Sequence, residues 1–306
     1  MKLISVIILT YNSEKFIEEC LKSLEDDGYD NKEVIVVDNA SIDRTREIVE
    51  KYIPHSRMNI KYIQNEINRG CCGGNNDGFL TSKGEIVIFL NPDTIVTRGW
   101  INELIQPMLE DEKVGVTGCK ILYPDRKTIQ HCGGIIRPNG FTDHIGNRGE
   151  DKGQYDEIRE VDYVTGAAIA VRRNVFEELD GLDMDYFPAY FEETDFCVRA
   201  RKKGYKILYV PKAVIIHYES ASLTVYSPKF HTAYAKARVK FLFKNYSLKH
   251  ILTKALPFEL KWYLKKWSKG LRRYQIKAYI HSLLFFTKKL FRKKLKNLII
   301  EGGRQE

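Results

Sequence analysis

Three acidic side chains lie within four residues in the segment FPAYFEETDF, residues 187–196: Glu192, Glu193 and Asp195. Aromatic residues flank them, and burying like charges together is costly unless a metal ion, a cation or a raised pKa relieves the repulsion. Such a cluster indicates catalytic chemistry. The residues that follow are typical of a helix, so an acidic first turn that complements the helix dipole is the alternative interpretation.

A second group of polar side chains follows the apolar run Ile86–Leu90, which predicts a buried strand. Pro92 removes a backbone donor and fixes the turn, so Asn91 and Asp93 would both present oxygens outward. Hard oxygens beside a bound diphosphate are what Mg²⁺ or Mn²⁺ prefers, and such an ion neutralises charge on a departing group. A single aspartate at a strand end also serves as a cap or an ion-pair partner, and both readings stay open.

One histidine ends a further β-branched run. His217 follows Val214–Ile216 and precedes Tyr218 and Glu219. By itself such a histidine is more often structural than a ligand. His131 and His144 have no partner that the sequence reveals.

The elements that must position these groups begin at the N-terminus. Residues 4–9 form a continuous apolar run of the kind found in buried parallel strands, and a helical spacing follows Ser13. A second strand at 34–37 leads to a helix around Ile48, which predicts a βαβ beginning. Ligands bind beyond the carboxyl ends of such strands, so the polar residues there should gather at one edge. These are Thr10, Tyr11, Asn12, Asp38, Asn39 and Ser41, and Asp38 could accept from a base N–H or a ribose hydroxyl.

A glycine-rich segment, NRGCCGGNNDG at residues 68–78, predicts a loop where the backbone approaches a ligand closely. It holds neither the GxGxxG fingerprint nor the GK[ST] of a P-loop, so dinucleotide and ATP sites lose their main support. A purely structural turn is the alternative. Further along, residues 161–171 predict another strand.

The composition excludes several classes of protein. The chain has 306 residues, 43% of them hydrophobic and 29% charged, which excludes disorder, collagen and a small disulfide scaffold. Six cysteines without a CxxC pair, and no signal sequence before the first strand, favour a reducing cytoplasm. No apolar run approaches the roughly 18 residues of a spanning helix, so we expect no membrane crossing.

The charge is unevenly distributed. From Phe230 to the end there are 20 Lys and Arg against 3 Asp and Glu, or +17, which leaves 29 against 37, or −8, before it. We therefore expect two units: a catalytic domain at residues 1–226 and a basic amphipathic helical extension at 227–306.

The extension has two apolar stripes beside lysines and arginines. The first comprises Leu260, Leu264, Trp267 and Leu271, and the second Leu284, Phe291, Leu295 and Leu298. One interpretation is that these stripes pack on the main domain. The other is that the tail, with Trp262, Trp267, Phe285 and Phe286, lies on an anionic membrane surface. Binding to nucleic acid is disfavoured, because no nucleic-acid-binding motif accompanies the charge.

Taken together, residues 3 to about 222 resemble the inverting nucleotide-sugar glycosyltransferases of glycosyltransferase family 2, in its rhamnosyltransferase-like branch. The resemblance rests on ordered motifs: SVIILTYNSE, VIVVDNASIDRT, NRGCCGGNNDG, IFLNPDT, GLD, YFEETDFCVRARKKGY and VPKAVIIHYESAS. It implies the GT-A fold, an α/β Rossmann-like mixed sheet flanked by helices, here with the basic helical extension.

The resemblance also implies residue roles. Asp38 would contact the nucleobase with Thr10 and Asn12, while Asn68, Gly70 and Asn75 would line the donor pocket beside the turn Asn91-Pro92-Asp93. Asp93 is the remaining acid of the family's metal motif, in which Asn91 replaces the first, and His217 would complete the metal site. Glu193 matches the catalytic base, accompanied by Asp195. The family more often has aspartate at that position, so Glu192 is the alternative base.

The implied function is transfer of a sugar, with inversion and with Mg²⁺ or Mn²⁺, from dTDP-rhamnose or a UDP-sugar to a hydroxyl group. The acceptor would be a saccharide or lipid-linked saccharide of cell-envelope polysaccharide biosynthesis, met in the cytoplasm or peripherally on the inner face of the membrane. Two alternatives stay open. A sugar nucleotidyltransferase would usually carry a glycine-rich basic loop after the first strand, which TYNSEKF is not; a non-catalytic sugar-nucleotide-binding scaffold would bind without turnover.

Overall fold

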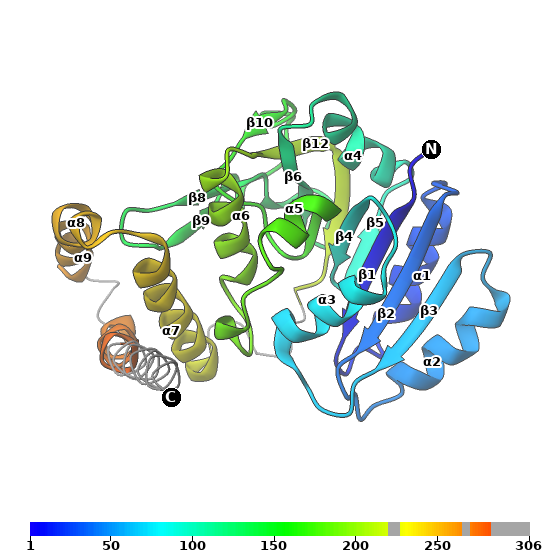
Figure 1. Ribbon diagram of the computed structural model, residues 1–306, viewed down its shortest axis with the longest axis horizontal. Coiled ribbons are helices and arrows are strands. Elements are labelled where there is room, and N and C mark those ends of the chain that lie inside the picture. Colours follow the sequence, from blue (N-terminus) through cyan, green and yellow to red (C-terminus); the bar gives the residue numbers. More distant parts are fainter. Residues whose placement is uncertain (220–226, 265–269, 283–306) are drawn as a thin grey trace, which may run out of the picture. The chain divides into compact units, whose positions relative to one another are not determined.

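The structure, a computed structural model, describes residues 1–219, 227–264 and 270–282 (Figure 1). The chain divides into two compact units. The first consists of Met1–Arg137 and Phe141–Thr224, and the second of Pro138–Gly140 and Val225–Glu306.

The first unit is built on one mixed sheet, as expected for an α/β fold. The described strands follow the order β10-β12-β6-β11-β4-β1-β2-β3, with β5 beside β12 and β7 beside β6. Their bounds are β1 Ile4–Thr10, β2 Lys32–Asp38, β3 Asn59–Gln64, β4 Ile86–Leu90, β5 Thr94–Val96, β6 Val114–Leu122, β7 Ile129–His131, β10 Arg159–Glu160, β11 Ala168–Arg172 and β12 Lys206–His217. A separate hairpin joins β8 Gly134–Ile136 to β9 Thr142–His144.

The parallel strands of the sheet end at the edge where the site is expected. β1 lies between β2 and β4, parallel to both, and Thr10 pairs with Asp38 at the carboxyl end. The predicted strands over 4–9, 34–37 and 86–90 are thereby confirmed. Every residue of β2 and β4 is buried, which explains why these runs are apolar throughout rather than alternating.

Helices cover both faces of this sheet. They are α1 Ile17–Asp26, α2 Thr45–Tyr52, α3 Gly70–Thr81, α4 Trp100–Glu110, α5 Arg173–Glu178 and α6 Glu192–Lys202, with short 3₁₀ turns η1 Ile53–His55 and η2 Met184–Tyr186. One core joins α1, α2 and α4 to Ile4, Val6 and Ile8 of β1. On the other face Phe176 of α5 contacts Phe79 of α3 and Phe196 of α6, with ring centroids 4.3 and 5.3 Å apart.

The glycine-rich segment is a helix, so the predicted loop is wrong. Residues 70–81 form α3 against β1 and β2. A Cβ added at Gly78 would lie 2.5 Å from Cγ2 of Ile7, and one at Gly74 would lie 2.2 Å from Cδ1 of Leu9. The glycines therefore let the helix approach the sheet closely, and they are not there for loop flexibility. The strand predicted over 161–171 is also too long, since β11 comprises only Ala168–Arg172.

We expect Gly78→Ala to destabilise the protein by about 1–3 kcal/mol, because the methyl group meets the fully buried, β-branched side chain of Ile7. Urea denaturation of the full chain measures this. Gly270→Ala is the matched control, since Gly270 is helical and a Cβ there meets no atom within 4 Å; it should be neutral or stabilising by up to ~1 kcal/mol. Equal stability of the Gly78 variant and wild type would contradict the packing argument.

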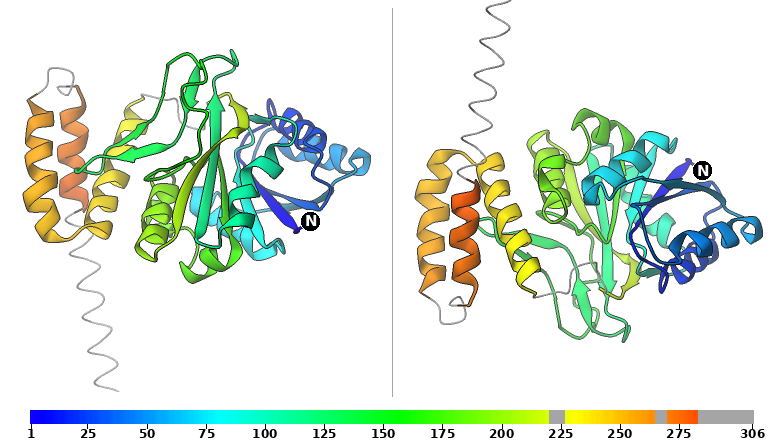
Figure 2. Two further views of the ribbon diagram at one scale, coloured as in Figure 1. Left: turned by 90° about the horizontal axis from the view of Figure 1, so that it is seen from above. Right: turned by 90° about the horizontal axis from the view of Figure 1, so that it is seen from below.

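The second unit is helical. α7 spans Pro228–Asn245, and a second long helix runs through α8 Leu248–His250, the π turn η3 Ile251–Ala255 and α9 Leu256–Tyr263. Residues 270–282 are helical as well and lie beside both (Figure 2). Ala235 and Val239 of α7 pack against Ala278. Arg238 is fully buried and its Nη2 lies 2.9 Å from Oε1 of Glu259.

The first tail stripe is exposed in the residues that the structure describes. Leu260 is 58% and Leu264 is 84% exposed, whereas Trp262, which one of the two interpretations placed at a membrane surface, is 5% exposed. Arg238 explains this, because its charge holds Glu259 inside and so turns the neighbouring leucines outward. Trp267, Phe285, Phe286 and the second stripe lie outside the described residues. Within the described part of the chain, no helix is long and apolar enough to span a bilayer.

Candidate functional site

Asp38 ends β2 at the edge where ligands are expected. Its side chain is fully buried. Oδ1 accepts from the backbone N–H and the hydroxyl of Ser41, at 2.9 and 2.5 Å, and Oδ2 accepts from the hydroxyl of Tyr62 at 2.7 Å. The carboxylate thus closes the turn after β2, and a nucleobase would share it with Ser41 and Tyr62.

The residues after β1 lie at the same edge. Thr10 is buried and its hydroxyl donates to a backbone carbonyl of β2. Asn12 has a left-handed backbone, with φ 53°; its N–H donates to the hydroxyl of Ser41 and its Oδ1 accepts from the backbone N–H of Ile42. Tyr11 is 37% exposed. Of the three predicted donor contacts here, Tyr11 and Asn12 are exposed and therefore accessible to a ligand, whereas Thr10 is buried.

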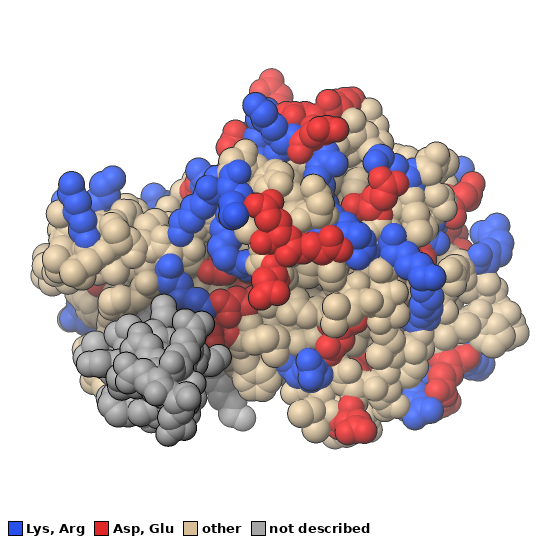
Figure 3. All heavy atoms as spheres, in the orientation of Figure 1, with Lys and Arg blue, Asp and Glu red and all other residues tan. Residues whose placement is uncertain are grey.

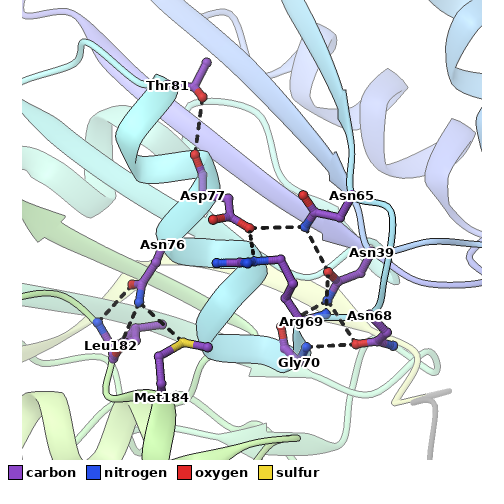
Figure 4. A network of polar contacts seen from close by, with 10 residues as sticks. All are labelled: Asn39, Asn65, Asn68, Arg69, Gly70, Asn76, Asp77, Thr81, Leu182 and Met184. Atoms are coloured by element: carbon purple, nitrogen blue, oxygen red, sulfur yellow. Dashed lines mark hydrogen bonds and ion pairs between the residues drawn. The ribbon is translucent and has the colours of Figure 1, made fainter.

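A network of asparagines joins the end of β2 to the start of α3 (Figure 4). Nδ2 of Asn39 donates to Oδ1 of Asn68, at 3.3 Å, and to the carbonyl of Gly70, at 3.0 Å. Oδ1 of Asn39 accepts from Nδ2 of Asn65 and from the backbone N–H of Arg69, both at 3.1 Å. These bonds hold the N-terminus of α3, with its positive dipole end, beside the predicted donor residues.

The segment that carries the acidic cluster rests on the same helix end. The backbone N–H of Cys71 donates to the carbonyl of Pro188 at 2.8 Å. Gly70 has φ +69°, and a Cβ there would lie 2.7 Å from the ring of Phe187. Tyr190 and Phe191 also have positive φ, 80° and 71°, immediately before α6 begins. Two such non-glycine residues in succession are uncommon, so packing imposes the turn that delivers the acids.

Glu192 and Glu193 begin α6 in unequal surroundings. Glu192 is 7% exposed, and within the described residues its Oε2 has no hydrogen-bond partner. Burial raises its pKa. Glu193 is partly exposed; burial and then the charge of Glu192 raise its pKa. Two adjacent carboxyl groups that both resist ionisation form a pair that readily takes up a proton.

Asp195 has a different environment from its two neighbours. It is 1% exposed, Oδ1 accepts from the hydroxyl of Tyr186 at 3.0 Å and Oδ2 accepts from Nε of Arg199 at 2.6 Å. Arg199 also donates to the carbonyls of Leu179 and Gly181. Both oxygens of Asp195 thus accept hydrogen bonds, and these bonds connect the first turn of α6 to the preceding loop.

Asp93 and His217 meet across two paired strands. Thr94 of β5 pairs with His217 of β12, and Oδ1 of Asp93 lies 3.2 Å from Nε2 of His217. Nδ1 of His217 lies 2.6 Å from Oε1 of Gln130, and that oxygen can only accept. The two ring nitrogens of His217 thus lie against Gln130 on one side and Asp93 on the other.

A chain of contacts connects this pair to the acidic cluster. The backbone N–H of Asn91 donates to the carbonyl of Ala167 at 2.9 Å. The next residue back, Gly166, faces Glu193, since a Cβ there would lie 3.8 Å from the Cβ of Glu193. The structure thus links the Asn91-Pro92-Asp93 turn at the end of β4 to the start of α6.

Asn75 lies one turn into α3, close to the acidic cluster. It is buried, and its Nδ2 lies 3.6 Å from Sγ of Cys71. Burial raises the pKa of Cys71, with Glu192 the next largest cause, so this thiol stays protonated and takes no nucleophilic part.

A divalent ion fits Asp93 and His217 only in part. Within the described residues no group of three His, Cys, Asp or Glu side chains is placed to hold a metal. One carboxylate and one imidazole supply two ligands of suitable chemistry, and further oxygens must come from a bound ligand or water.

Sequence patterns missed several residues that shape the site. Gln130 orients His217, Tyr62 bonds Asp38, and Tyr186 with Arg199 holds Asp195. Only the spacing of Arg199, one turn after Asp195, could have indicated its partner. His131 and His144, which had no visible partner in sequence, bond each other through Nδ1 atoms 3.0 Å apart.

The family described as "Glycosyl transferase family 2" matches residues 5–180, more than half of the chain. The O-antigen biosynthesis protein RfbC of Myxococcus xanthus is 32% identical over 155 residues, which are 48% of this chain and 12% of RfbC. This chain therefore spans about an eighth of the length of that curated relative.

Two solved structures share the fold. The mannosyltransferase PcManGT of Pyrobaculum calidifontis, in complex with GDP-Man and Mn²⁺, has a TM-score of 0.61 and 18% identity over 97% of this chain and 80% of its own. TarS 1–349 of S. aureus, in complex with UDP-GlcNAc, has a TM-score of 0.59 and 22% identity over 91% of this chain and 79% of its own.

Proposed function

The chain belongs to glycosyl transferase family 2, with the expected GT-A fold, and from that premise we propose that it transfers a sugar from a nucleoside diphosphate donor to an acceptor hydroxyl with inversion. One observation carries the proposal: the partly exposed carboxyl of Glu193 lies beside Gly166, whose neighbour bonds the turn that holds Asp93. A proton acceptor and a diphosphate-binding turn therefore share one edge of the sheet.

Glu193 is the proposed general base. A raised pKa makes its carboxylate a stronger proton acceptor, and partial exposure lets an acceptor hydroxyl approach. Deprotonating that hydroxyl lets its oxygen attack the anomeric carbon from the face opposite the departing diphosphate, so one C–O bond forms as the other breaks and configuration inverts. Glu192 is less accessible, and Asp195 is a positioning residue because Tyr186 and Arg199 occupy both its oxygens.

The donor would lie across the ends of β1, β2 and β4. Tyr11, Asn12 and Asp38 would contact the nucleoside, with Thr10 and Asn39 supporting them. The N-terminus of α3, held by Asn68 at Gly70 and followed by Asn75, would face the sugar diphosphate. UDP-GlcNAc in TarS supports a UDP-sugar as donor, and dTDP-rhamnose is the alternative.

Asp93 and His217 would hold the divalent ion, beside Asn91 and Pro92. Bound there, Mg²⁺ or Mn²⁺ would neutralise charge on the departing diphosphate. Mn²⁺ in PcManGT supports the second choice, as does the imidazole ligand.

We expect Glu192→Gln to shift the rising limb of the pH–rate profile toward lower pH by about half a unit or more. The Glu192 charge raises the pKa of Glu193, so its removal lets Glu193 ionise at lower pH while the base itself is kept. Initial rates of nucleoside diphosphate release between pH 5 and 9 measure the limb. An unshifted limb would mean that Glu192 and Glu193 are not coupled, and loss of turnover would make Glu192 the base.

The reaction class is tested by incubating the full chain with candidate UDP- and dTDP-sugars, Mn²⁺ and saccharide acceptors. Release of nucleoside diphosphate with a glycosylated product is the expected result. Exchange of pyrophosphate into the donor would instead identify a sugar nucleotidyltransferase. Donor binding, seen as a raised melting temperature, without any turnover would identify a scaffold.

For the acceptor we propose a saccharide or lipid-linked saccharide of the cell envelope, glycosylated at the inner face of the membrane. The name of RfbC, an O-antigen biosynthesis protein, supports this class. The excess of basic residues after Phe230 supports an anionic membrane surface as the place where such an acceptor is met.

A further inference from the structure

A row of leucines lies exposed along the second long helix of the second unit. Leu248, Leu252, Leu256, Leu260 and Leu264 are 67%, 55%, 47%, 58% and 84% exposed; they are called here the leucine stripe. Their four-residue spacing slightly overshoots an α-helical turn, and the π turn Ile251–Ala255 offsets part of that drift. The five side chains therefore follow one side of the helix, where water covers them in the isolated chain.

The opposite side of this helix explains why the leucines face outward. Ala255, Glu259 and Trp262 are 2%, 3% and 5% exposed. Arg238 donates to both oxygens of Glu259, and Asn139 donates to one of them. A buried and fully bonded ion pair is costly to break, so the helix cannot turn over to bury its leucines instead. An apolar side that is fixed outward is characteristic of an interaction surface.

The charges around the leucine stripe indicate what covers it. Within the described residues of the second unit, Glu259 is the one acidic residue, and Arg238 neutralises it inside. Lys249, Lys254 and Lys261 are exposed on the same helix. The surface over α8 and α9 accordingly shows Lys and Arg among uncharged residues (Figure 3). The partner must therefore be both apolar and anionic.

The helix of residues 270–282 also combines exposed apolar side chains with exposed cations. Ile276 and Ile280 are 53% and 58% exposed, and Arg273 and Lys277 are exposed on the same helix. A second copy of this chain is a poor occupant, because pairing two such surfaces would bring cations together without acids between them. An amphipathic helix with exposed leucines and flanking lysines instead matches a bilayer surface with anionic headgroups.

We propose that the leucine stripe docks on an anionic phospholipid bilayer, with the leucines in the headgroup–acyl boundary and Lys249, Lys254 and Lys261 against the lipid phosphates. This surface was not visible in the tail patterns read from sequence, which placed Trp262 at the lipid and grouped Leu260 with Trp267. The inference rests on the proposed function for its purpose, which is access to a lipid-linked acceptor. Its test involves no reaction, so the two can fail separately.

The test is sedimentation of the full chain with vesicles of phosphatidylcholine, alone or with phosphatidylglycerol replacing about a third of it. Wild type should bind the anionic vesicles and not the neutral ones. Leu256→Ser combined with Leu260→Ser should lower the partition coefficient at least about tenfold. Lys254→Gln combined with Lys261→Gln should lower it by a similar factor, at about fivefold for each charge.

Leu109→Ser is the matched control, because Leu109 of α4 is 47% exposed, as Leu256 is, but belongs to the first unit; it should bind lipid as wild type does. Equal binding of the double leucine variant and wild type would overturn the proposal. So would a concentration-dependent wild-type dimer that the leucine substitutions dissolve, because a second copy would then be the occupant. Nucleoside diphosphate release with a soluble acceptor, measured on the same variants, reports the proposed function independently.

Discussion

Glu193→Gln is expected to reduce turnover by about a hundred- to ten-thousandfold, the range that a general base contributes. The amide keeps the shape of the side chain but cannot take the proton of an acceptor hydroxyl. Donor affinity should stay within about twofold, because no contact among the described residues places Glu193 against the nucleoside edge formed by Asp38 and Tyr11. Single-turnover product formation and donor titration separate the two quantities.

Three further variants make this result specific. Glu192→Gln should keep most of the turnover at its optimum pH, which distinguishes the two adjacent acids. Glu177→Gln is the matched surface control, because the side chain of Glu177 is 56% exposed on α5; its rate should equal that of wild type. Glu193→Asp retracts the carboxylate by one methylene and should keep part of the rate. Near wild-type turnover in Glu193→Gln would remove the assigned base.

Asp93→Asn is expected to weaken Mn²⁺-dependent binding of a nucleoside diphosphate by more than about a hundredfold. The substitution removes the carboxylate whose Oδ1 lies 3.2 Å from Nε2 of His217, and the loss of a direct ligand should exceed the 10- to 100-fold typical of outer partners. Binding without metal should change little. Calorimetric titration of the nucleotide with and without Mn²⁺, and the electron paramagnetic resonance signal of free Mn²⁺, measure these effects.

Gln130→Leu tests a residue that would support a metal ligand without binding the metal itself, and its effect should be smaller than that of Asp93→Asn. Oε1 of Gln130 lies 2.6 Å from Nδ1 of His217, so the loss of Gln130 should weaken Mn²⁺ binding by about 10-fold without removing a ligand. Asp30→Asn, at an exposed acid beyond the amino end of β2, should change nothing. Equal Mn²⁺ affinity in Asp93→Asn and Asp30→Asn would show that the ion is held elsewhere, whether or not Glu193 is the base.

Several elements could be predicted from local pattern. The apolar runs at 4–9, 34–37 and 86–90 identify buried parallel strands because helices cover both faces of that sheet. The polar residues that follow each run then had to share one edge, since parallel strands end together. The acidic start of α6 at Glu192 was likewise visible as the first turn of a helix.

The glycine-rich segment shows where local pattern misleads. Helix propensity disfavours four glycines in residues 70–81, so a loop was expected. The helix forms because Gly74 and Gly78 allow it to lie closer to β1 than any side chain would. The stabilising contacts come from a strand more than sixty residues earlier, which no window of sequence contains.

The sequence by itself determined the strand and helix alternation, the edge where Asp38 and Asp93 lie, and a basic, amphipathic C-terminal part, because each depends on residue type and spacing along one segment. Only the tertiary structure decided that Asp195 forms an ion pair with Arg199 and that Gln130 orients His217. It also decided that the leucine stripe faces outward while Glu259 is buried. Those outcomes depend on partners that are distant in sequence. The charges and hydrogen-bonding groups of these partners determine which face of a helix or strand is buried, and the local pattern does not distinguish these faces.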